Sequence, residues 1–191
     1  MSFSMNRFRR ILGAAALLCA AVLGSACAGG DSPSAEVTTV SAARNLDLTS
    51  APALTGAKVL TVKGKGVDGR FPGGLALDIA ALERLRVVDA VTEDPWEKRT
   101  VTYRGVLMSD LVKAIAPSGA TAMRFTALDD YEVTLPMKDL QGGDALLATS
   151  ITGKRIAIKD GGPIRIVFLP KSTAGHNKDL WIWSIAKMTA T

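Results

Sequence analysis

The sequence predicts an α+β domain built on a mixed or antiparallel sheet, and three observations lead to that prediction. Apolar residues alternate with period two in many short runs, which favours strands. A period near 3.6 recurs in only a few places, which favours a small number of short helices. The 191 residues are 48% hydrophobic and 21% charged, a globular composition that excludes a disordered chain. Many strands with a few short helices are typical of the α+β class.

The first 30 residues have the layout of a secretory signal peptide. A basic start over residues 1–10 precedes the apolar run Ile11–Gly24, and small residues follow. The apolar run is shorter than the roughly 20 residues that a membrane-spanning helix needs. We therefore expect a signal peptide over residues 1–28 and an exported protein, either periplasmic or lipid-anchored on the membrane.

Two processing routes fit the end of this segment. Residues 26–28 (Ala-Cys-Ala) have the small-x-small pattern of ordinary signal peptidase, whereas residues 23–27 (Leu-Gly-Ser-Ala-Cys) resemble a bacterial lipobox. In the second route cleavage falls before Cys27, which is lipidated, and the lipid is the only attachment to a membrane that we expect. Phe8–Leu12 is also a partial twin-arginine pattern, typical of proteins exported already folded.

Residues 29–56 are rich in Ser, Ala, Thr and Pro and predict a flexible tether, in part compatible with a first strand. We expect the folded domain over residues 57–191. Within it, Leu77–Leu85 spaces its apolar residues for a short helix, with Asp78 suited to the first turn. Leu107–Ile115 repeats apolar residues at steps of four and predicts a second helix, which ends before Pro117.

The other runs of the domain predict strands. Asp129 and Asp130 mark the turn of an expected hairpin, and Gly105 is expected to break the chain. The expected strands are, in order, Lys58–Lys63, Arg86–Thr92, Thr100–Tyr103, Thr121–Ala127, Tyr131–Leu135, Ala145–Thr149, Ile164–Phe168 and Leu180–Ile185.

Charge and cysteine content exclude several classes of function. The net charge is +5, but three arginines and no acid lie in the first 27 residues, which leaves 20 Lys+Arg against 18 Asp+Glu. A nearly balanced domain has no electrostatic footprint for nucleic acid. The two cysteines, Cys19 and Cys27, lie in the N-terminal segment. Residues 37–191 therefore provide no disulfide, zinc–thiolate cluster or thiolate nucleophile.

Only one residue of the domain suggests general-base catalysis at neutral pH. His176 is the single histidine. None of its candidate serine partners, Ser109, Ser150 and Ser184, lies in a G-x-S-x-G frame. A solvated loop histidine is the simpler interpretation.

A group of acidic residues between positions 129 and 144 matches no calcium-loop spacing. Turn chemistry explains the first two without any functional role. The group consists of Asp129, Asp130, Glu132, Asp139 and Asp144.

The stretch Lys159–Phe168 is the most informative of the domain. Gly161 and Gly162 precede Pro163 and predict an unusual turn, after which a strand begins. Arg165 lies between two isoleucines of that strand. It points either to solvent, as period two allows, or to an anion that its planar guanidinium suits.

Two features follow this stretch. Gly175–Lys178 is a small glycine-bearing loop with a cation, a type of backbone that can cradle phosphate. If Arg165 and Lys178 act on one ligand, we expect them to converge on one cleft. Trp181 and Trp183 are two apart in an expected strand and should face one side of it, as core or as the wall of a pocket.

Five blocks of the domain occur in the order found in molybdopterin-dependent oxidoreductases of the sulfite oxidase type, and the chain resembles that family over residues 87–188. The resemblance is closest to the small, exported, stand-alone members. The blocks are Tyr103–Val112, Ala122–Phe125 with Asp130–Pro136, Leu146–Ala148, Asp160–Arg165 and Leu180–Trp183.

The resemblance implies the α+β fold of the sulfite oxidase-type molybdopterin-binding domain, a mixed sheet with a few short helices. In the larger relatives this fold holds a pterin-bound molybdenum and performs two-electron reactions with oxygen-atom transfer. By position, Asp160 and Arg165 fall where relatives contact the pterin, and Lys178 falls near their phosphate-contacting loop.

The chain departs from the family in one respect. In the catalytic relatives a cysteine thiolate ligates molybdenum from the segment that corresponds to Val91–Arg99, which here contains no cysteine. Glu93 or Asp94 offers a carboxylate, but a soft thiolate suits the metal of these enzymes better. No cysteine of the domain is therefore available to ligate molybdenum.

Two functions of different classes remain. The first is a non-catalytic exported module that binds a small molecule, such as a pterin, or serves an exported sensor or redox partner. The second is an active molybdopterin-dependent oxidoreductase that holds its cofactor by pterin contacts alone. Molybdenum content discriminates between them. A serine hydrolase using His176 has little support.

Overall fold

The computed structural model describes residues 37–44 and 46–191, which belong to one compact unit. The expected signal peptide (residues 1–28) and Cys27 lie outside the described residues. Within the described part, no helix is both long and apolar enough to span a membrane. The elements are β1 (Val37–Ser41), β2 (Leu60–Gly64), β3 (Leu75–Leu77), α1 (Ile79–Leu82), β4 (Val87–Asp94), β5 (Arg99–Leu107), α2 (Met108–Ile115), β6 (Ala122–Ala127), β7 (Glu132–Pro136), α3 (Met137–Gln141), β8 (Ala145–Ile151), β9 (Lys154–Arg155), β10 (Arg165–Phe168) and β11 (Ile185–Ala190), with short 3₁₀-helices η1 (Ile158–Asp160), η2 (Ala174–His176) and η3 (Lys178–Leu180).

One sheet is antiparallel throughout. Its strands follow the order β1-β4-β5-β8-β10, and β9 pairs with β8. Every residue of β10 is buried, and so is almost every residue of β8. Both faces of the sheet are therefore covered at these strands, and a charged residue in β10 has to lie inside the protein.

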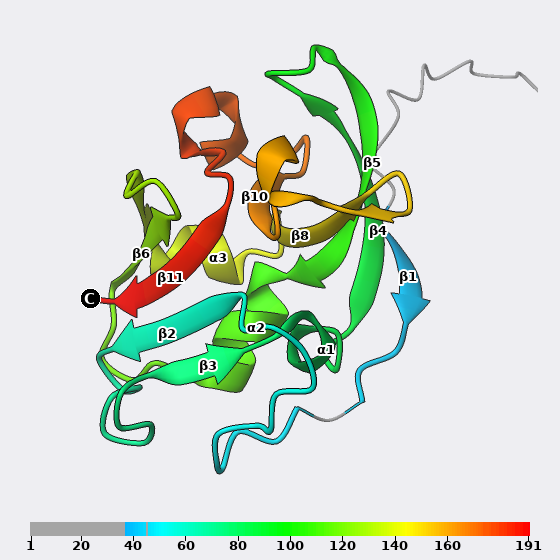
Figure 1. Ribbon diagram of the computed structural model, residues 1–191. Coiled ribbons are helices and arrows are strands. Elements are labelled where there is room, and N and C mark those ends of the chain that lie inside the picture. Colours follow the sequence, from blue (N-terminus) through cyan, green and yellow to red (C-terminus); the bar gives the residue numbers. More distant parts are fainter. Residues whose placement is uncertain (1–36, 45) are drawn as a thin grey trace, which may run out of the picture. The chain divides into compact units, whose positions relative to one another are not determined.

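The second sheet is mixed. Its order is β3-β2-β11-β6-β7, with β11 parallel to β2 and antiparallel to β6. Figure 1 shows the C-terminal strand β11, in red, between β2 and β6. The last strand of the chain therefore joins the second strand to the middle of the chain. The two sheets and three short helices confirm the predicted α+β fold.

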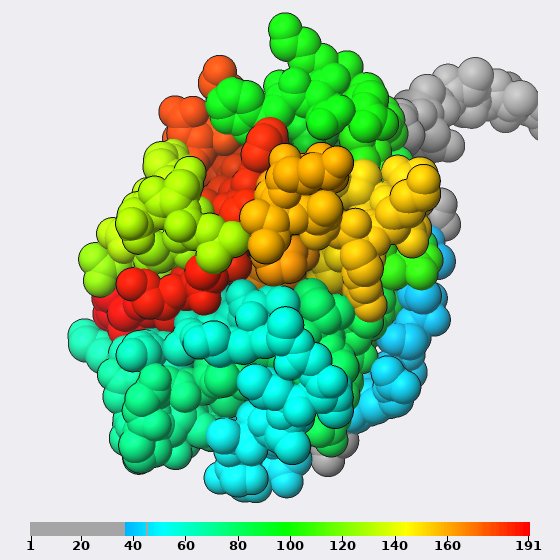
Figure 2. Space-filling view, viewed as in Figure 1, coloured from blue at the N-terminus to red at the C-terminus, as the bar shows by residue number. Residues whose placement is uncertain are grey.

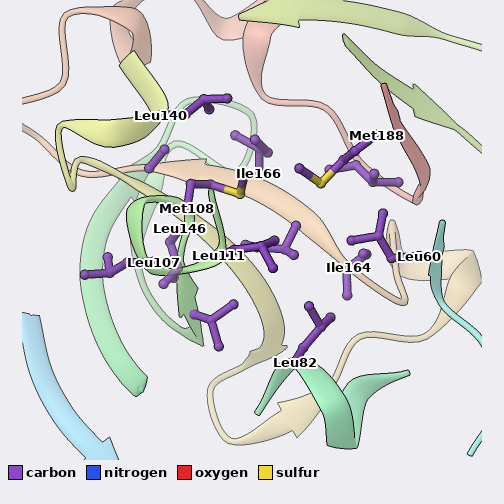
Figure 3. Close-up of a cluster of buried hydrophobic side chains, with 14 of the residues drawn as sticks. Leu60, Leu82, Leu107, Met108, Leu111, Leu140, Leu146, Ile164, Ile166 and Met188 are labelled. Atoms are coloured by element: carbon purple, nitrogen blue, oxygen red, sulfur yellow. The ribbon is translucent and has the colours of Figure 1, made fainter. Parts of the chain in front are cut away.

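The hydrophobic core connects the two sheets and the helices. Side chains from β2 and β11 meet those of β8, β10 and the helices, as the close-up in Figure 3 shows. Leu60, Leu82, Met108, Leu111, Leu140, Leu146, Ile164, Ile166 and Met188 each have no exposed surface. The apolar faces of α1 and α2 that the sequence predicted both lie in this core.

Asp78 begins α1 and also anchors the segment before it. It is the N-cap residue, and its Oδ1 accepts a hydrogen bond from the Ala81 N–H at 2.7 Å. Its Oδ2 accepts from the backbone N–H groups of Thr55 and Gly56 at 2.7 and 2.8 Å. The sequence placed Asp78 one position too late, in the first turn instead of at the cap.

Two expected features differ from the structure, and one short helix was not expected. Leu180–Ile185 is not a strand: η3 and extended chain precede β11, which begins only at Ile185. Gly105 does not break the chain but continues β5 past an irregularity in its pairing with β8. A Cβ atom at Gly105 would lie 2.1 Å from the Leu147 carbonyl oxygen, so the glycine permits close strand contact. The short helix α3 was not expected at all.

The segment expected as a tether contains ordered structure. Val37–Ser41 forms β1 and pairs with β4, the alternative that its composition left open. Leu46 and Leu48 are buried in the core. The ordered part of the chain therefore begins before residue 57.

Candidate functional site

Arg165 lies inside the protein near the start of β10. Its side chain is 3% exposed, so the interpretation that it points to solvent is wrong. The strand is covered on both faces, so the alternation of period two does not bring this residue to the surface. One guanidinium nitrogen, Nη2, donates a hydrogen bond to the backbone oxygen of Asp160 at 3.0 Å. The Nε atom is buried and has no hydrogen-bond partner, which is an unusual and costly state for a donor.

Two aromatic rings flank the Arg165 guanidinium. Its Cζ atom lies 4.9 Å from the centroid of Trp183 and 5.6 Å from that of Tyr103. Both distances are within the range of cation–π attraction. The charge of Arg165 is therefore stabilised in part by ring faces, while one of its N–H groups stays unpaired.

Tyr103 and Asp94 form a buried pair beside Arg165. The Tyr103 hydroxyl donates to Asp94 Oδ2, and Asp94 Oδ1 accepts from the Trp96 and Glu97 N–H groups at 2.8 and 2.9 Å. Burial raises the pKa of Tyr103 far above its usual value, and the hydrogen bond to Asp94 raises it further. Tyr103 therefore stays protonated at neutral pH. Both oxygens of Asp94 are therefore engaged, Oδ1 by the turn after β4 and Oδ2 by Tyr103 on β5.

A pair of tryptophans lies next to this cluster. Trp96 and Trp183 pack edge to face with their centroids 6.1 Å apart. Lys178 is exposed, and its Nζ atom lies 4.7 Å from the centroid of Trp96. Arg165 and Lys178 thus contact the two different rings of one aromatic pair.

An open cavity of about 580 Å³ borders this tryptophan pair. Its walls include five of the exposed large hydrophobic residues, which are 36–67% exposed: Trp96, Leu128, Tyr131, Ile158 and Trp183. Figure 2 shows the segments that contribute Leu128 and Tyr131 (yellow-green), Ile158 (gold) and Trp183 (red) on one face of the molecule. A cluster of exposed apolar side chains around a concavity is typical of a binding site.

The structure brings together only some of the predicted site residues. Arg165 and Lys178 reach the same tryptophan pair, but neither lines the cavity. Asp160 is exposed and contacts Arg165 through its backbone oxygen. The three residues remain predictions as cofactor contacts.

Trp181 and Trp183 both line the cavity, which agrees with the prediction that they form the wall of a pocket. Trp181 is buried, packs edge to face on Phe168 and donates its Nε1–H to the Gly175 oxygen at 2.9 Å. Trp183 is 36% exposed at the same cavity. Only the predicted strand was wrong, because η3 ends at Leu180 and β11 begins at Ile185.

Among the described residues, no hydrogen bond joins the His176 side chain to any of its candidate serine partners. His176 is exposed in η2, while Ser150 is buried on β8 and accepts a bond from Arg155. In the described part of the chain, no group of three or more His, Cys, Asp or Glu residues could hold a metal ion.

Several residues of the site were not assigned to it by the sequence analysis. Tyr103 and Tyr131 lie in two of the family blocks but were given no role there. Asp94 and Trp96 lie in the segment Val91–Arg99 that the resemblance singled out, and Asp94 was considered only as a metal ligand.

Comparisons with known proteins agree with this architecture. The model of the family described as "Oxidoreductase molybdopterin binding domain" matches residues 79–190. Among solved structures, the sulfane dehydrogenase SoxCD from Paracoccus pantotrophus is similar, with a TM-score of 0.53 and 14% identity over 84% of this chain. The match covers 48% of the SoxCD chain, so this chain spans about half the length of its structural neighbour. None of the curated proteins matches.

Proposed function

The chain belongs to the family of oxidoreductase molybdopterin-binding domains, and from this premise we propose that it is an exported, non-catalytic binding module that lacks a protein ligand for molybdenum. The proposal rests on the absence of a suitable metal ligand in the segment where relatives have their cysteine. No cysteine occurs in residues 37–191. Asp94 uses both carboxylate oxygens within the protein, and Glu93 is exposed on β4.

The residues present do not fit a molybdenum centre with a protein ligand. Molybdenum in this family is expected to need a soft donor, and the buried carboxylate of Asp94, which contacts Tyr103 beside Arg165, is already hydrogen-bonded through both oxygens. The unpaired Nε of Arg165 would suit an anionic ligand. The ring of Trp183 packs on that guanidinium, however, and leaves it 3% exposed. We therefore derive no redox step for this site.

What the arrangement supports is recognition. The cavity beside Trp96 and Trp183 is open, mostly apolar and walled by aromatic rings, which can stack on a ligand. Family membership suggests a pterin without molybdenum as one such ligand. An exported sensor or redox protein is the partner that such a module would serve.

A second function is favoured by one observation. The Nε–H of Arg165 has no hydrogen-bond partner and could donate to a pterin. An enzyme that holds its cofactor through pterin contacts alone would need such a donor. This candidate requires Trp183 to leave the guanidinium before the cofactor enters.

Molybdenum content separates the two functions. The full chain is purified from its own host, together with a cysteine-ligated molybdoenzyme of that host as a positive control, and both are assayed by elemental mass spectrometry. We expect the control to hold about one molybdenum per chain and this protein to hold a negligible fraction. About one molybdenum per chain of this protein would overturn the non-catalytic proposal.

Export is tested at the mature N-terminus. We propose removal of residues 1–28, or cleavage before Cys27 with lipidation of its thiol. Intact-mass measurement of membrane and periplasmic fractions distinguishes a diacylglyceryl-modified Cys27 from a chain that begins at Gly29. Recovery of only full-length protein from the cytoplasm would contradict the export proposal.

A further inference from the structure

We propose that the tryptophan-lined cavity and a neighbouring lysine-lined cavity form one binding site for a small planar aromatic anion, a ring system that carries a sulfonate, carboxylate or phosphate. The inference rests on the proposed function, since it names the ligand class of a binding module. It does not involve Asp160, Arg165 or Lys178, because none of these lines either cavity.

The two cavities adjoin. The second has a volume of about 560 Å³ and shares Leu128 and Ile158 with the first. These two side chains are 53% and 67% exposed and form the apolar wall that both cavities share, here called the saddle. Each volume is in the range of a small-molecule site, about 300–1,000 Å³. One ligand that crosses the saddle can therefore reach both cavities.

The second cavity is positively charged. Lys58, Lys63 and Lys187 line it, from the approach to β2, from β2 itself and from the adjacent β11. Within the described residues, none of the three lysines forms a salt bridge, and no acidic residue lines this cavity. Three unneutralised ammonium groups around one concavity favour an anion.

The first cavity provides the opposite end of the site. Trp96, Trp183 and Tyr131 present aromatic rings, and Trp96 and Trp183 are held edge to face, so the walls are partly fixed before a ligand arrives. Rings of this kind favour a flat ring over a flexible acyl chain. The acid at this end is Asp129, whose Oδ1 accepts from the Tyr131 N–H at 3.2 Å. Its charge disfavours an anion here and so orients the anionic group of the ligand toward the lysines.

Two dyes that differ in one group test this polarity. The probes are 8-anilino-1-naphthalenesulfonate and N-phenyl-1-naphthylamine, which share the ring system, but only the first carries the sulfonate. We expect the sulfonate dye to bind the full chain at one site and to quench tryptophan fluorescence. The uncharged dye should bind about tenfold more weakly or worse, and added salt should weaken only the sulfonate dye.

Variants assign the two ends of the site. The double variant Lys63→Gln/Lys187→Gln should weaken the sulfonate dye about tenfold and leave the uncharged dye unchanged. The matched control Lys138→Gln/Lys154→Gln removes two exposed lysines that line neither cavity and should change nothing. Leu128→Glu places a carboxylate on the saddle and should abolish binding of the sulfonate dye.

The outcomes are separable. Equal binding of both dyes, or no effect of the lysine double variant beyond its control, overturns the inference. Dye binding that Leu128→Glu leaves intact overturns it as well, because the site would then lie elsewhere. Molybdenum found in the same preparation would overturn the proposed function, whatever the dyes do.

Discussion

At the scale of single residues, Arg165 has the most unusual environment of the described chain. It is buried, one of its donors is unpaired, and two rings flank its charge. A buried cation that is not fully paired contributes little stability for its cost and is often retained for a functional reason.

Substitution of Arg165 should change the free energy of unfolding mainly through lost packing and less through lost charge. Arg165→Ala leaves a cavity beside Trp183 and Tyr103 and should lower the free energy of unfolding by about 2–4 kcal/mol. Arg165→Met keeps most of the volume and removes the unpaired Nε, so its loss should be below about 1.5 kcal/mol. Urea denaturation measures both.

The control for this pair is Arg124→Ala. Arg124 is exposed and lies 3.6 Å from Glu132 in a solvated ion pair, so the change should be within about 0.5 kcal/mol. If Arg165→Met proved as destabilising as Arg165→Ala, the guanidinium contacts would matter more than we infer.

Asp78 gives a pH dependence whose direction follows from its contacts. Burial alone would raise its pKa, but hydrogen bonds from the N–H groups of Ala81, Gly56 and Thr55 outweigh burial and hold the pKa below its ordinary value of 3.8. Because the folded-state pKa is the lower one, the carboxylate stabilises the fold above the unfolded-state pKa. That contribution is lost as the pH falls through the folded-state pKa.

We therefore expect Asp78→Asn to destabilise the protein by about 1–2 kcal/mol at pH 7. The difference from the wild-type protein should shrink as the pH falls below about 4. Thermal unfolding at pH 7, 5 and 3.5 measures this. A difference that stays constant over that range would show that the charge of Asp78 has no part in its role.

At the scale of elements, the close contact between β5 and β8 requires a glycine, Gly105, which has no side chain. A Cβ atom at Gly105 would lie 2.1 Å from the Leu147 oxygen and 2.8 Å from the Ala148 Cα atom. Both contacts are with backbone, which cannot move aside without separating the strands. These strands carry Tyr103 and position it under Arg165.

Gly105→Ala should accordingly destabilise the protein by about 3 kcal/mol or more. Gly69→Ala is the matched control, because nothing lies within 4 Å of a Cβ atom there, and it should change stability by no more than about 0.5 kcal/mol. Urea midpoints with unchanged m-values measure both changes. Similar midpoints for the two variants would contradict this account of the strand contact.

At the scale of the whole described unit, one sheet and the core both include parts of the segment that precedes residue 57. β1 extends one sheet at β4, whereas the last strand, β11, pairs with β2 and β6 in the other sheet. Leu46 and Leu48 add to the core, and Asp78 accepts hydrogen bonds from the N–H groups of Thr55 and Gly56. Residues 37–44 and 46–56 are therefore part of the folded structure.

Truncation tests this boundary. Residues 37–191 include both sheets and should fold with a stability close to that of the longer chain. Removal of residues 37–56 as well exposes a strand edge and deletes two buried leucines, each worth about 1.5–3 kcal/mol of burial. We expect the chain 57–191 to lose several kcal/mol or to aggregate, as circular dichroism and sedimentation would show. Equal stability of the two fragments would support the shorter domain instead.

Local patterns in the sequence were enough to predict the fold class, most of the strands, the apolar faces of two helices and the family. Periodicity reports which faces are apolar, and the faces of α1, α2 and the β6–β7 hairpin agree with the prediction. The resemblance also named Arg165 and Lys178, which contact the two rings of one tryptophan pair although neither lines the cavity. Composition excluded a thiolate site in residues 37–191 with no structure needed.

Tertiary structure alone decided the character of the site. Whether Arg165 faces water depends on what covers β10. That cover comes from Tyr103, which is distant in sequence, and from Trp183, which lies in a segment that does not form the predicted strand. The apolar run Leu180–Ile185 fits a strand by its pattern, but only packing decides that Trp181 docks on Phe168 while Trp183 stays 36% exposed. Burial and ring contacts are properties of the packed molecule, so a local pattern names the residues of the site but not their exposure.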